Sequence, residues 1–193
     1  MKVVLVNYGA GNIKSLQFAL ERLGVDGILS SDVTEIQDAN KVIFPGVGEA
    51  SSAMMKLKES GLDLVIPKLK QPVLGICLGM QLMCTHTEEG NTPGLGIFDV
   101  AVKRFDSDLK VPQMGWNTLE KTASPLFSTL DSGTYMYSVH SYYAGLCKET
   151  IAQTTYGISY SCALQKGNFY GVQFHPEKSS KAGSQLLSNF LTM

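Results

Sequence analysis

The chain has 193 residues and a formal net charge of -1 at pH 7, with 44% hydrophobic and 17% charged residues. This composition is typical of a folded globular domain and excludes an intrinsically disordered chain. The small net charge gives no reason to expect nucleic acid or a membrane surface as a partner. Apolar runs are too short for a bilayer span of roughly 20 residues or for a signal peptide. We therefore expect a single cytoplasmic domain, 1–193.

The first half of the chain alternates buried strands with helices. Continuous apolar runs predict strands buried on both faces at Lys2–Val6, Lys41–Phe44 and Val73–Ile76. Apolar residues at helical spacing predict helices over residues 13–23, 51–60 and 78–84. This order of strand and helix implies a mostly parallel sheet with helices on both sides.

After about Gly90 the pattern changes to short extended segments separated by glycines and prolines. The predicted strands are Gly94–Val102, Gly115–Leu119, Thr134–Tyr143, Ile151–Tyr156, Cys162–Gln165 and Phe169–Phe174, followed by a helix over Lys181–Leu191. These strands indicate an antiparallel β portion that is added to the central sheet or continues it. The predicted fold class is therefore α/β: a mostly parallel central sheet flanked by helices, with an added antiparallel portion.

Four cysteines are present at irregular spacing: Cys77, Cys84, Cys147 and Cys162. The simplest interpretation is four reduced thiols in a cytoplasmic protein. No CxxC pair occurs in the sequence, so we predict neither a zinc site nor another metal site, and we expect no cofactor.

The segment Gly75-Ile76-Cys77-Leu78-Gly79 carries the sharpest chemical signal. A buried strand runs straight into Cys77 and a helix begins directly after it, which is the layout of a nucleophile elbow with cysteine in place of serine. We expect side chains at 75 and 79 to crowd the neighbouring strands, so both positions need glycine. A helix N-terminus favours the thiolate, and the Leu78 N–H is a candidate oxyanion donor. The alternative is a buried structural cysteine in a tight turn.

A cysteine nucleophile needs a base, and the sequence offers three histidines. His86 falls on the predicted helix after Cys77 and is expected at the surface, and His140 lies within an aromatic strand. His175 follows a predicted strand, so it should reach the same carboxyl edge of the sheet as Cys77. Glu177 could then fix the imidazole tautomer. A His-Pro turn with a surface glutamate is the alternative.

Together these residues resemble a known family. The segments GICLGMQ at 75–81 and VQFHPEKS at 172–179 are similar to the triad-type, class I glutamine amidotransferases, which have a flavodoxin-like fold. More specific segments are NYGAGN at 7–12, FPGVG at 44–48, VPQMGWN at 111–117 and VHSYY at 139–143. They resemble the branch of the family that delivers ammonia to a (βα)8-barrel cyclase in histidine biosynthesis.

The resemblance implies a role for each matching position. Cys77 would be the nucleophile, His175 the general base and acid, and Glu177 the residue that orients the histidine. A second oxyanion N–H would come from Val47 or Gly46. Glutamine would be bound by Gly48, Gln81, Glu89, Ser141 and Tyr142, with Glu88 a weaker alternative to Glu89.

The implied partner is the cyclase, in a heterodimer. The surface of this chain that contacts the cyclase would include Asn12, Met114, Trp116 and Lys178, although Trp116 could instead be a core residue. Three other functions stay open: the glutaminase of a different amidotransferase, a cysteine hydrolase or deglycase, and a catalytically silent assembly subunit.

Overall fold

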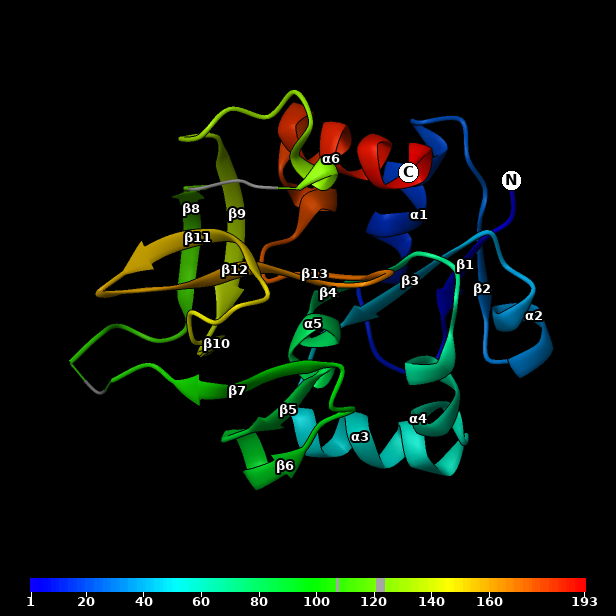
Figure 1. Ribbon diagram of the computed structural model, residues 1–193, viewed down its shortest axis with the longest axis horizontal. Coiled ribbons are helices and arrows are strands. Elements are labelled where there is room, and N and C mark those ends of the chain that lie inside the picture. The colour runs from blue at the N-terminus through cyan, green and yellow to red at the C-terminus, as the bar shows by residue number, and fades with distance from the viewer. Residues whose placement is uncertain (107, 121–123) are drawn as a thin grey trace.

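The computed structural model describes residues 1–106, 108–120 and 124–193 (Figure 1). Its main sheet has the strand order β2-β1-β3-β4-β13-β12-β10-β7-β5-β6, with β11 paired to β12. The first five of these strands are mutually parallel. They are β2 (Gly27–Ser30), β1 (Val3–Val6), β3 (Lys41–Gly46), β4 (Val73–Cys77) and β13 (Phe169–Val172). The order 2-1-3-4 is that of a flavodoxin-like sheet, as predicted.

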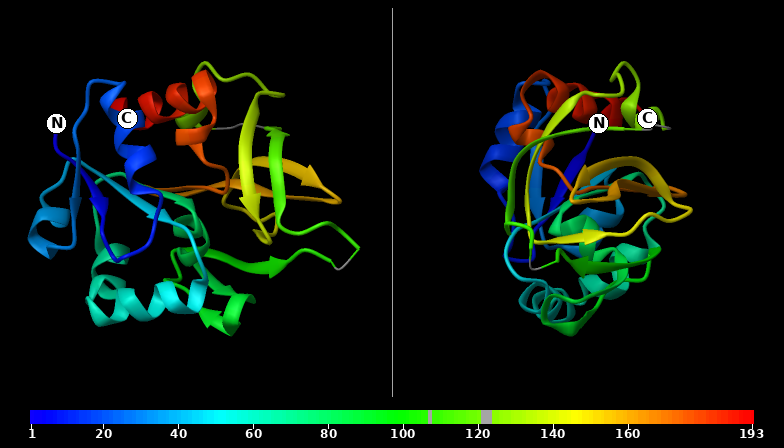
Figure 2. Two further views of the ribbon diagram at one scale, coloured as in Figure 1. Left: turned by 180° about the vertical axis from the view of Figure 1, so that it is seen from behind. Right: turned by 90° about the vertical axis from the view of Figure 1, so that its left-hand side faces the viewer.

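The remaining strands extend the sheet and add a second, smaller one. The extension comprises β12 (Ile158–Lys166), β11 (Thr150–Tyr156), β10 (Tyr142–Ala144), β7 (Phe98–Arg104), β5 (Cys84–Thr87) and β6 (Thr92–Pro93). A separate antiparallel pair, β8 (Gln113–Thr118) and β9 (Tyr135–His140), stands at the end of the molecule away from β2 (Figures 1 and 2). The antiparallel portion is confirmed, and it both continues the sheet and adds to it.

Helices cover the two faces of the parallel sheet. One face packs against α1 (Ile13–Glu21) and α6 (Ser180–Thr192). The opposite face packs against α2 (Val33–Gln37), α3 (Ala50–Glu59), α4 (Leu62–Val65) and α5 (Leu78–Leu82). Figure 2 shows these groups above and below the sheet. Because helices cover both faces, β1, β3, β4 and β13 are buried along their whole length, whereas the edge strand β2 is partly exposed.

The turns after β3, β4 and β13 lie together at one edge of the sheet. These three strands are parallel neighbours, and their register pairs Gly46 with Cys77 and Val172 with Ile76. The backbone therefore brings the turn beginning at Gly46, the Cys77 turn and the segment leading to His175 to the same place.

Several predicted elements differ from the structure: β7 begins at Phe98 and not at Gly94, β12 spans Ile158–Lys166 and not only Cys162–Gln165, and two elements change in type or continuity. Helix α5 ends at Leu82, and Cys84–Thr87 forms strand β5, paired with β7, so Cys84 and His86 do not share a helix with Cys77. The predicted strand Thr134–Tyr143 divides at Ser141, where the chain leaves the small sheet as β9 and enters the main sheet as β10. Four further elements were not predicted: β2, α2, α4 and β6.

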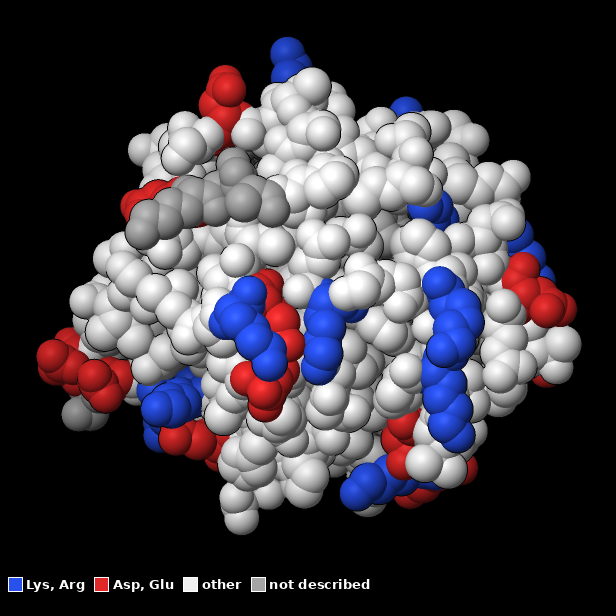
Figure 3. All heavy atoms as spheres, in the orientation of Figure 1, with Lys and Arg blue, Asp and Glu red and all other residues white. Residues whose placement is uncertain are grey.

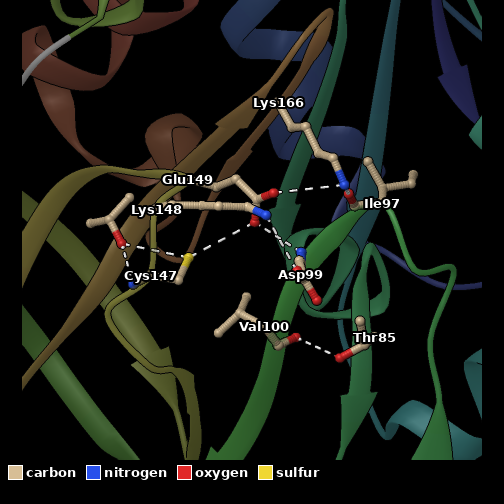
Figure 4. A network of polar contacts seen from close by, with 9 residues as sticks. Thr85, Ile97, Asp99, Val100, Cys147, Lys148, Glu149 and Lys166 are labelled. Atoms are coloured by element: carbon tan, nitrogen blue, oxygen red, sulfur yellow. Dashed lines mark hydrogen bonds and ion pairs between the residues drawn. The ribbon is translucent and has the colours of Figure 1, made fainter.

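A buried carboxylate joins strands of the extension (Figure 4). Glu149 Oε2 accepts a hydrogen bond from the Asp99 N–H at 2.8 Å, and its Oε1 lies 3.6 Å from Lys166 Nζ. Lys166 Nζ also donates to the Ile97 carbonyl at 2.6 Å. These contacts tie the segment before β11 to β7 and β12.

The surface carries charges of both signs. On the face shown in Figure 3, Lys and Arg side chains and Asp and Glu side chains are scattered over a mostly uncharged surface. Within the described ranges, none of the helices has the length and apolar character needed to cross a bilayer.

Candidate active site

Cys77 occupies a strained turn between β4 and α5. Its φ of 54° lies in the left-handed region, which non-glycine residues rarely adopt, and such strain is typical of functional sites. A Cβ at Gly79 would lie 1.9 Å from the Phe44 carbonyl oxygen, so the prediction that this side chain would crowd a neighbouring strand is confirmed. A Cβ at Gly75 would instead meet Met83 and Met80, in and just after the following helix. The expectation of a strand clash at 75 is therefore wrong.

His175 lies within hydrogen-bonding reach of Cys77 and is itself held by Glu177. His175 Nδ1 is 2.8 Å from Glu177 Oε1, and both side chains are 3% exposed. Burial lowers the pKa of His175, but hydrogen bonds and charges from Cys77 and Glu177 outweigh burial and raise it to about 10. The imidazole is therefore cationic at neutral pH, and a cation beside a thiol favours the thiolate.

The two other buried cysteines of the core lie in a different environment. Burial raises the pKa of the Cys84 and Cys162 thiols, so both stay protonated. All four cysteines are free thiols, as predicted. Among the described residues, no group of three His, Cys, Asp or Glu side chains gathers in an arrangement suited to a metal ion.

A cavity of about 280 Å³ opens beside the Cys77 sulfur. It brings together the turns after β3, β4 and β13 with the crossing between β9 and β10. The lining residues are Val47, Gly48, Cys77, Leu78, Gln81, Glu89, Val139, His140, Ser141, Tyr142 and His175. Every predicted glutamine-binding position is therefore found in one cavity with the predicted nucleophile and base.

The turn after β3 contributes unequally to this cavity. Val47 and Gly48 line it, and Gly48 adopts a φ of 103°. Gly46 packs against α5 instead, because a Cβ there would lie 2.6 Å from the Gly79 nitrogen. Of the two residues predicted to supply the second oxyanion N–H, the geometry favours Val47. The roles of Val47 and Leu78 as oxyanion donors stay predictions.

Glu89 and Glu88 point to different places. Glu89 lines the cavity, and its Oε2 accepts from the Ala50 N–H at 2.9 Å. Burial raises the pKa of Glu89, and the Ala50 N–H opposes that shift only in part. Glu88 is exposed and accepts from the Arg104 N–H. The choice of Glu89 over Glu88 therefore agrees with the geometry, while its contact with substrate stays a prediction.

The other two histidines are outside the triad. His86 lies on β5, where its Nε2 is 2.9 Å from Asn91 Oδ1. His140 is 7% exposed at the end of β9, with Nδ1 2.7 Å from the Tyr142 carbonyl and Nε2 3.1 Å from the Tyr160 hydroxyl. Burial lowers the pKa of His140 to about 4, and the charge of His175 adds to that effect. His140 is therefore a neutral part of the cavity wall.

Gln173 was missed by the sequence predictions. It is fully buried between β13 and His175, and its Nε2 lies 3.8 Å from Cys77 Sγ. The available signal was a glutamine inside the otherwise apolar run from Tyr170 to Phe174, because a buried amide requires polar partners.

The predicted partner-interface residues are at the surface. Met114 and Trp116 on β8 are 67% and 52% exposed, so the alternative that Trp116 is a core residue is wrong. Trp116 and Lys178 line the same surface groove. Asn12 lies beside Gly46, His175 and Glu177 at the back of the triad.

Comparison with known proteins identifies the family. The glutamine amidotransferase class-I model matches residues 4–193. The chain is 54% identical to "Imidazole glycerol phosphate synthase subunit HisH" of Bacteroides thetaiotaomicron and 48% identical to the subunit of the same name in Pectobacterium atrosepticum, with 100% of each chain covered.

Solved structures agree on the fold. PurLQS from Thermotoga maritima matches with a TM-score of 0.74 and 17% identity, covering 100% of this chain and 99% of that one. A structure titled as a glutamine amidotransferase matches with a TM-score of 0.76 and 19% identity, covering 98% and 97%. The whole described chain therefore has the known fold and the motifs of this group, and it belongs to the class-I glutamine amidotransferase family.

Proposed function

We propose that this chain is the glutaminase subunit of imidazole glycerol phosphate synthase. It hydrolyses glutamine to glutamate and ammonia through a thioester on Cys77. The observation that carries the chemistry is the contact of one cavity-lining thiol with a cationic imidazole that is fixed by a buried carboxylate. Full-length identity of 54% to a subunit of that synthase supports the assignment to this enzyme.

The first half of the reaction forms the thioester. The Cys77 thiolate attacks the carboxamide carbon, a C–S bond forms, and the oxygen becomes an oxyanion beside the N–H groups of Leu78 and Val47. His175 then gives its proton to the nitrogen, the C–N bond breaks, and ammonia leaves. Glu177 stabilises the imidazolium before this transfer and keeps Nδ1 protonated afterwards.

The second half restores the enzyme. Neutral His175 takes a proton from water, the resulting hydroxide attacks the thioester carbon, and the C–S bond breaks to release glutamate. The products are one glutamate and one ammonia per glutamine and water. The pair of Cys77 thiolate and His175 imidazolium is then ready for the next glutamine.

Ammonia released into water would be lost to protonation and dilution, so a receiving partner is needed. We infer a (βα)8-barrel cyclase subunit that uses the ammonia to make imidazole glycerol phosphate and an aminoimidazole carboxamide ribotide. The exposed Met114 and Trp116, together with Lys178 and Asn12, support a contact surface on the side of the molecule that carries the triad. Cytoplasmic location follows from this role.

Glutamate release from glutamine in the presence of the cyclase tests the function. We expect Cys77→Ala to abolish it, while Cys147→Ala, which removes a thiol outside the cavity, retains it. Covalent labelling by a glutamine-like electrophile should require Cys77. Undiminished turnover by Cys77→Ala would refute the mechanism, and absence of labelling in the wild type would favour a silent assembly subunit.

The turn at Gly46–Gly48 suggests dependence on the partner. Val47 is 40% exposed and Gly48 adopts a φ that suits glycine, so the backbone around Val47 has room to reorient and turn the Val47 N–H towards the cavity. We expect the isolated chain to hydrolyse glutamine poorly and the complex to hydrolyse it well. Equal rates with and without the cyclase would contradict this expectation.

A further inference from the structure

Two buried amide side chains connect the cavity wall with the sulfur of Cys77. Gln173 lies level with Cys77 because the preceding residue, Val172, pairs with Ile76. Gln173 Nε2 is 3.8 Å from Cys77 Sγ, and Gln173 Oε1 accepts from Gln81 Nε2 at 2.9 Å. Gln173 is 0% exposed and Gln81 4% exposed, so these contacts are shielded from water.

A backbone carbonyl fixes the direction of both amides. Tyr142 O can only accept, so Gln81 turns its NH2 group towards it, at 2.9 Å. The same NH2 group gives its second hydrogen to Gln173, which must therefore present its oxygen. The NH2 group of Gln173 is then directed at Cys77. Reversing either amide would set like groups against each other in a buried site, which costs free energy.

The Tyr142 carbonyl, which orients both amides, is itself held in place. Tyr142 O also accepts a hydrogen bond from His140 Nδ1 at 2.7 Å, so both of its lone pairs are occupied. Because both amide hydrogens of Gln81 are committed, Oε1 is the polar atom of this cavity-lining side chain that is left to accept a hydrogen bond from substrate. The site therefore offers an acceptor at Gln81, which suits an N–H donor of the substrate.

We propose that Gln173 is a positioning residue for glutamine hydrolysis, with one role at each end of its amide. Its NH2 group gives Cys77 an N–H donor in addition to His175, which stabilises the charged thiolate more than the neutral thiol. Its oxygen holds Gln81 in the orientation that leaves Gln81 Oε1 to accept a hydrogen bond from substrate. The inference rests on the proposed glutaminase reaction for its kinetic test, but not for its test by alkylation.

Two substitutions separate the roles. Gln173→Glu has the same shape and keeps an oxygen for Gln81, but when ionised it removes the donor to the sulfur. At pH 8.5, with the cyclase present, we expect kcat to fall about tenfold and KM for glutamine to change less than about threefold. Gln173→Met removes both contacts, so KM should rise as well. In both variants the alkylation of Cys77 by iodoacetamide should slow by about tenfold.

Gln165→Met is the matched control. Gln165 is a half-buried glutamine that contacts Ser124 and Tyr170 away from the cavity, so the same replacement there should leave alkylation and turnover unchanged. Thermal unfolding establishes that each variant is folded, and the isosteric Glu variant carries the test if the Met variant is not.

The outcomes distinguish the two proposals. A folded Gln173 variant with the wild-type alkylation rate and wild-type kcat overturns the role of Gln173. Absence of glutamine turnover by the wild-type complex overturns the glutaminase function instead, while the alkylation series still decides whether Gln173 assists the thiolate.

Discussion

At the scale of single residues, the turn that carries Cys77 leaves no space for a side chain at position 79. The backbone around Cys77 passes so close to β3 that hydrogen is the only side chain that fits at Gly79. This closeness brings the turn after β3 next to the N-terminus of α5, and residues of both segments line the cavity. In the proposed mechanism the two oxyanion donors, Val47 and Leu78, come from these two segments, so glycine at position 79 is a condition for that arrangement.

Gly79→Ala should therefore be severely destabilising. The added Cβ would lie 1.9 Å from the Phe44 carbonyl oxygen, and strand and helix must separate to accept it. We expect a loss of about 3 kcal/mol or more in the free energy of unfolding, together with loss of turnover. Gly145→Ala is the control, since nothing lies within 4 Å of a Cβ there. Similar urea midpoints for the two variants would contradict this account.

His140 should make the protein sensitive to mild acid. Its pKa is lowered to about 4 in the folded state from an ordinary 6.5, so the unfolded chain binds a proton in this pH range that the folded chain does not. Stability is then fully present above pH 6.5 and falls as the pH decreases towards 4. Between pH 7.5 and pH 5 this group should cost about 2 kcal/mol.

The measurement is urea unfolding at both pH values for the wild type and His140→Asn. The asparagine amide can replace Nδ1 as donor to the Tyr142 carbonyl but does not titrate. We expect the variant to lose less stability than the wild type on acidification, by about 2 kcal/mol. Parallel losses would show that another group governs the acid response.

At the scale of strands and helices, the central strands of the parallel half were predictable, its edge elements β2 and α2 were not, and the β-rich half was predictable only in outline. Val42–Phe44 and Val73–Ile76 lack polar side chains because helices cover both faces of the sheet, and such runs are predicted directly from the sequence. The division of the Thr134–Tyr143 run at Ser141 could not be predicted from the sequence. Its alternation of side chains continues across the point where the chain leaves one sheet and enters the other. That division depends on which distant strand pairs with each half.

In the candidate site too, features set by local sequence were predicted and features set by distant contacts were not. Cys77 and His175 were identified because each sits at the end of a readable strand. Gln173 was missed because its importance lies in a contact across two strands, which local sequence does not encode. Strand β5 was assigned to a helix since its partner β7 decides its conformation.

The contacts of Glu149 with Lys166 and with the Asp99 N–H give a prediction for the stability of the β extension. Lys166 is the cation nearest the buried Glu149 carboxylate, whereas Lys148 pairs with exposed Asp99. Lys166→Met should destabilise the fold by about 1–3 kcal/mol, because a buried charge is left without its partner. Lys148→Met should change stability by less than about 0.5 kcal/mol. Equal effects of the two substitutions on thermal unfolding would show that the pair of Lys166 and Glu149 does not contribute to stability.

At the scale of the whole molecule, the separate β8–β9 sheet carries exposed apolar side chains that the core does not need. Trp116 touches Tyr137 edge to face, with ring centroids 5.9 Å apart, and otherwise faces outward. Met114 lies on the same strand two residues earlier. Large apolar side chains held on a short two-stranded sheet are suited to burial against another protein.

Trp116→Ala should weaken binding of the cyclase at least about tenfold while changing the free energy of unfolding by less than about 1.5 kcal/mol. Leu64→Ala is the control, because Leu64 is 66% exposed on α4, far from β8 (Figure 1). Titration calorimetry with the purified cyclase measures the binding affinity of both variants. Unchanged affinity in the Trp116 variant would place the interface elsewhere.

The place of β13 in the sheet has a consequence for the newly made polypeptide. This strand is inserted between β4 and β12, yet it follows both of them in the chain, so the centre of the sheet closes only when nearly all of the protein has left the ribosome. Until then Cys77 has no His175 imidazole beside it. A molecule truncated before β13 should therefore lack the base that the proposed glutaminase mechanism requires.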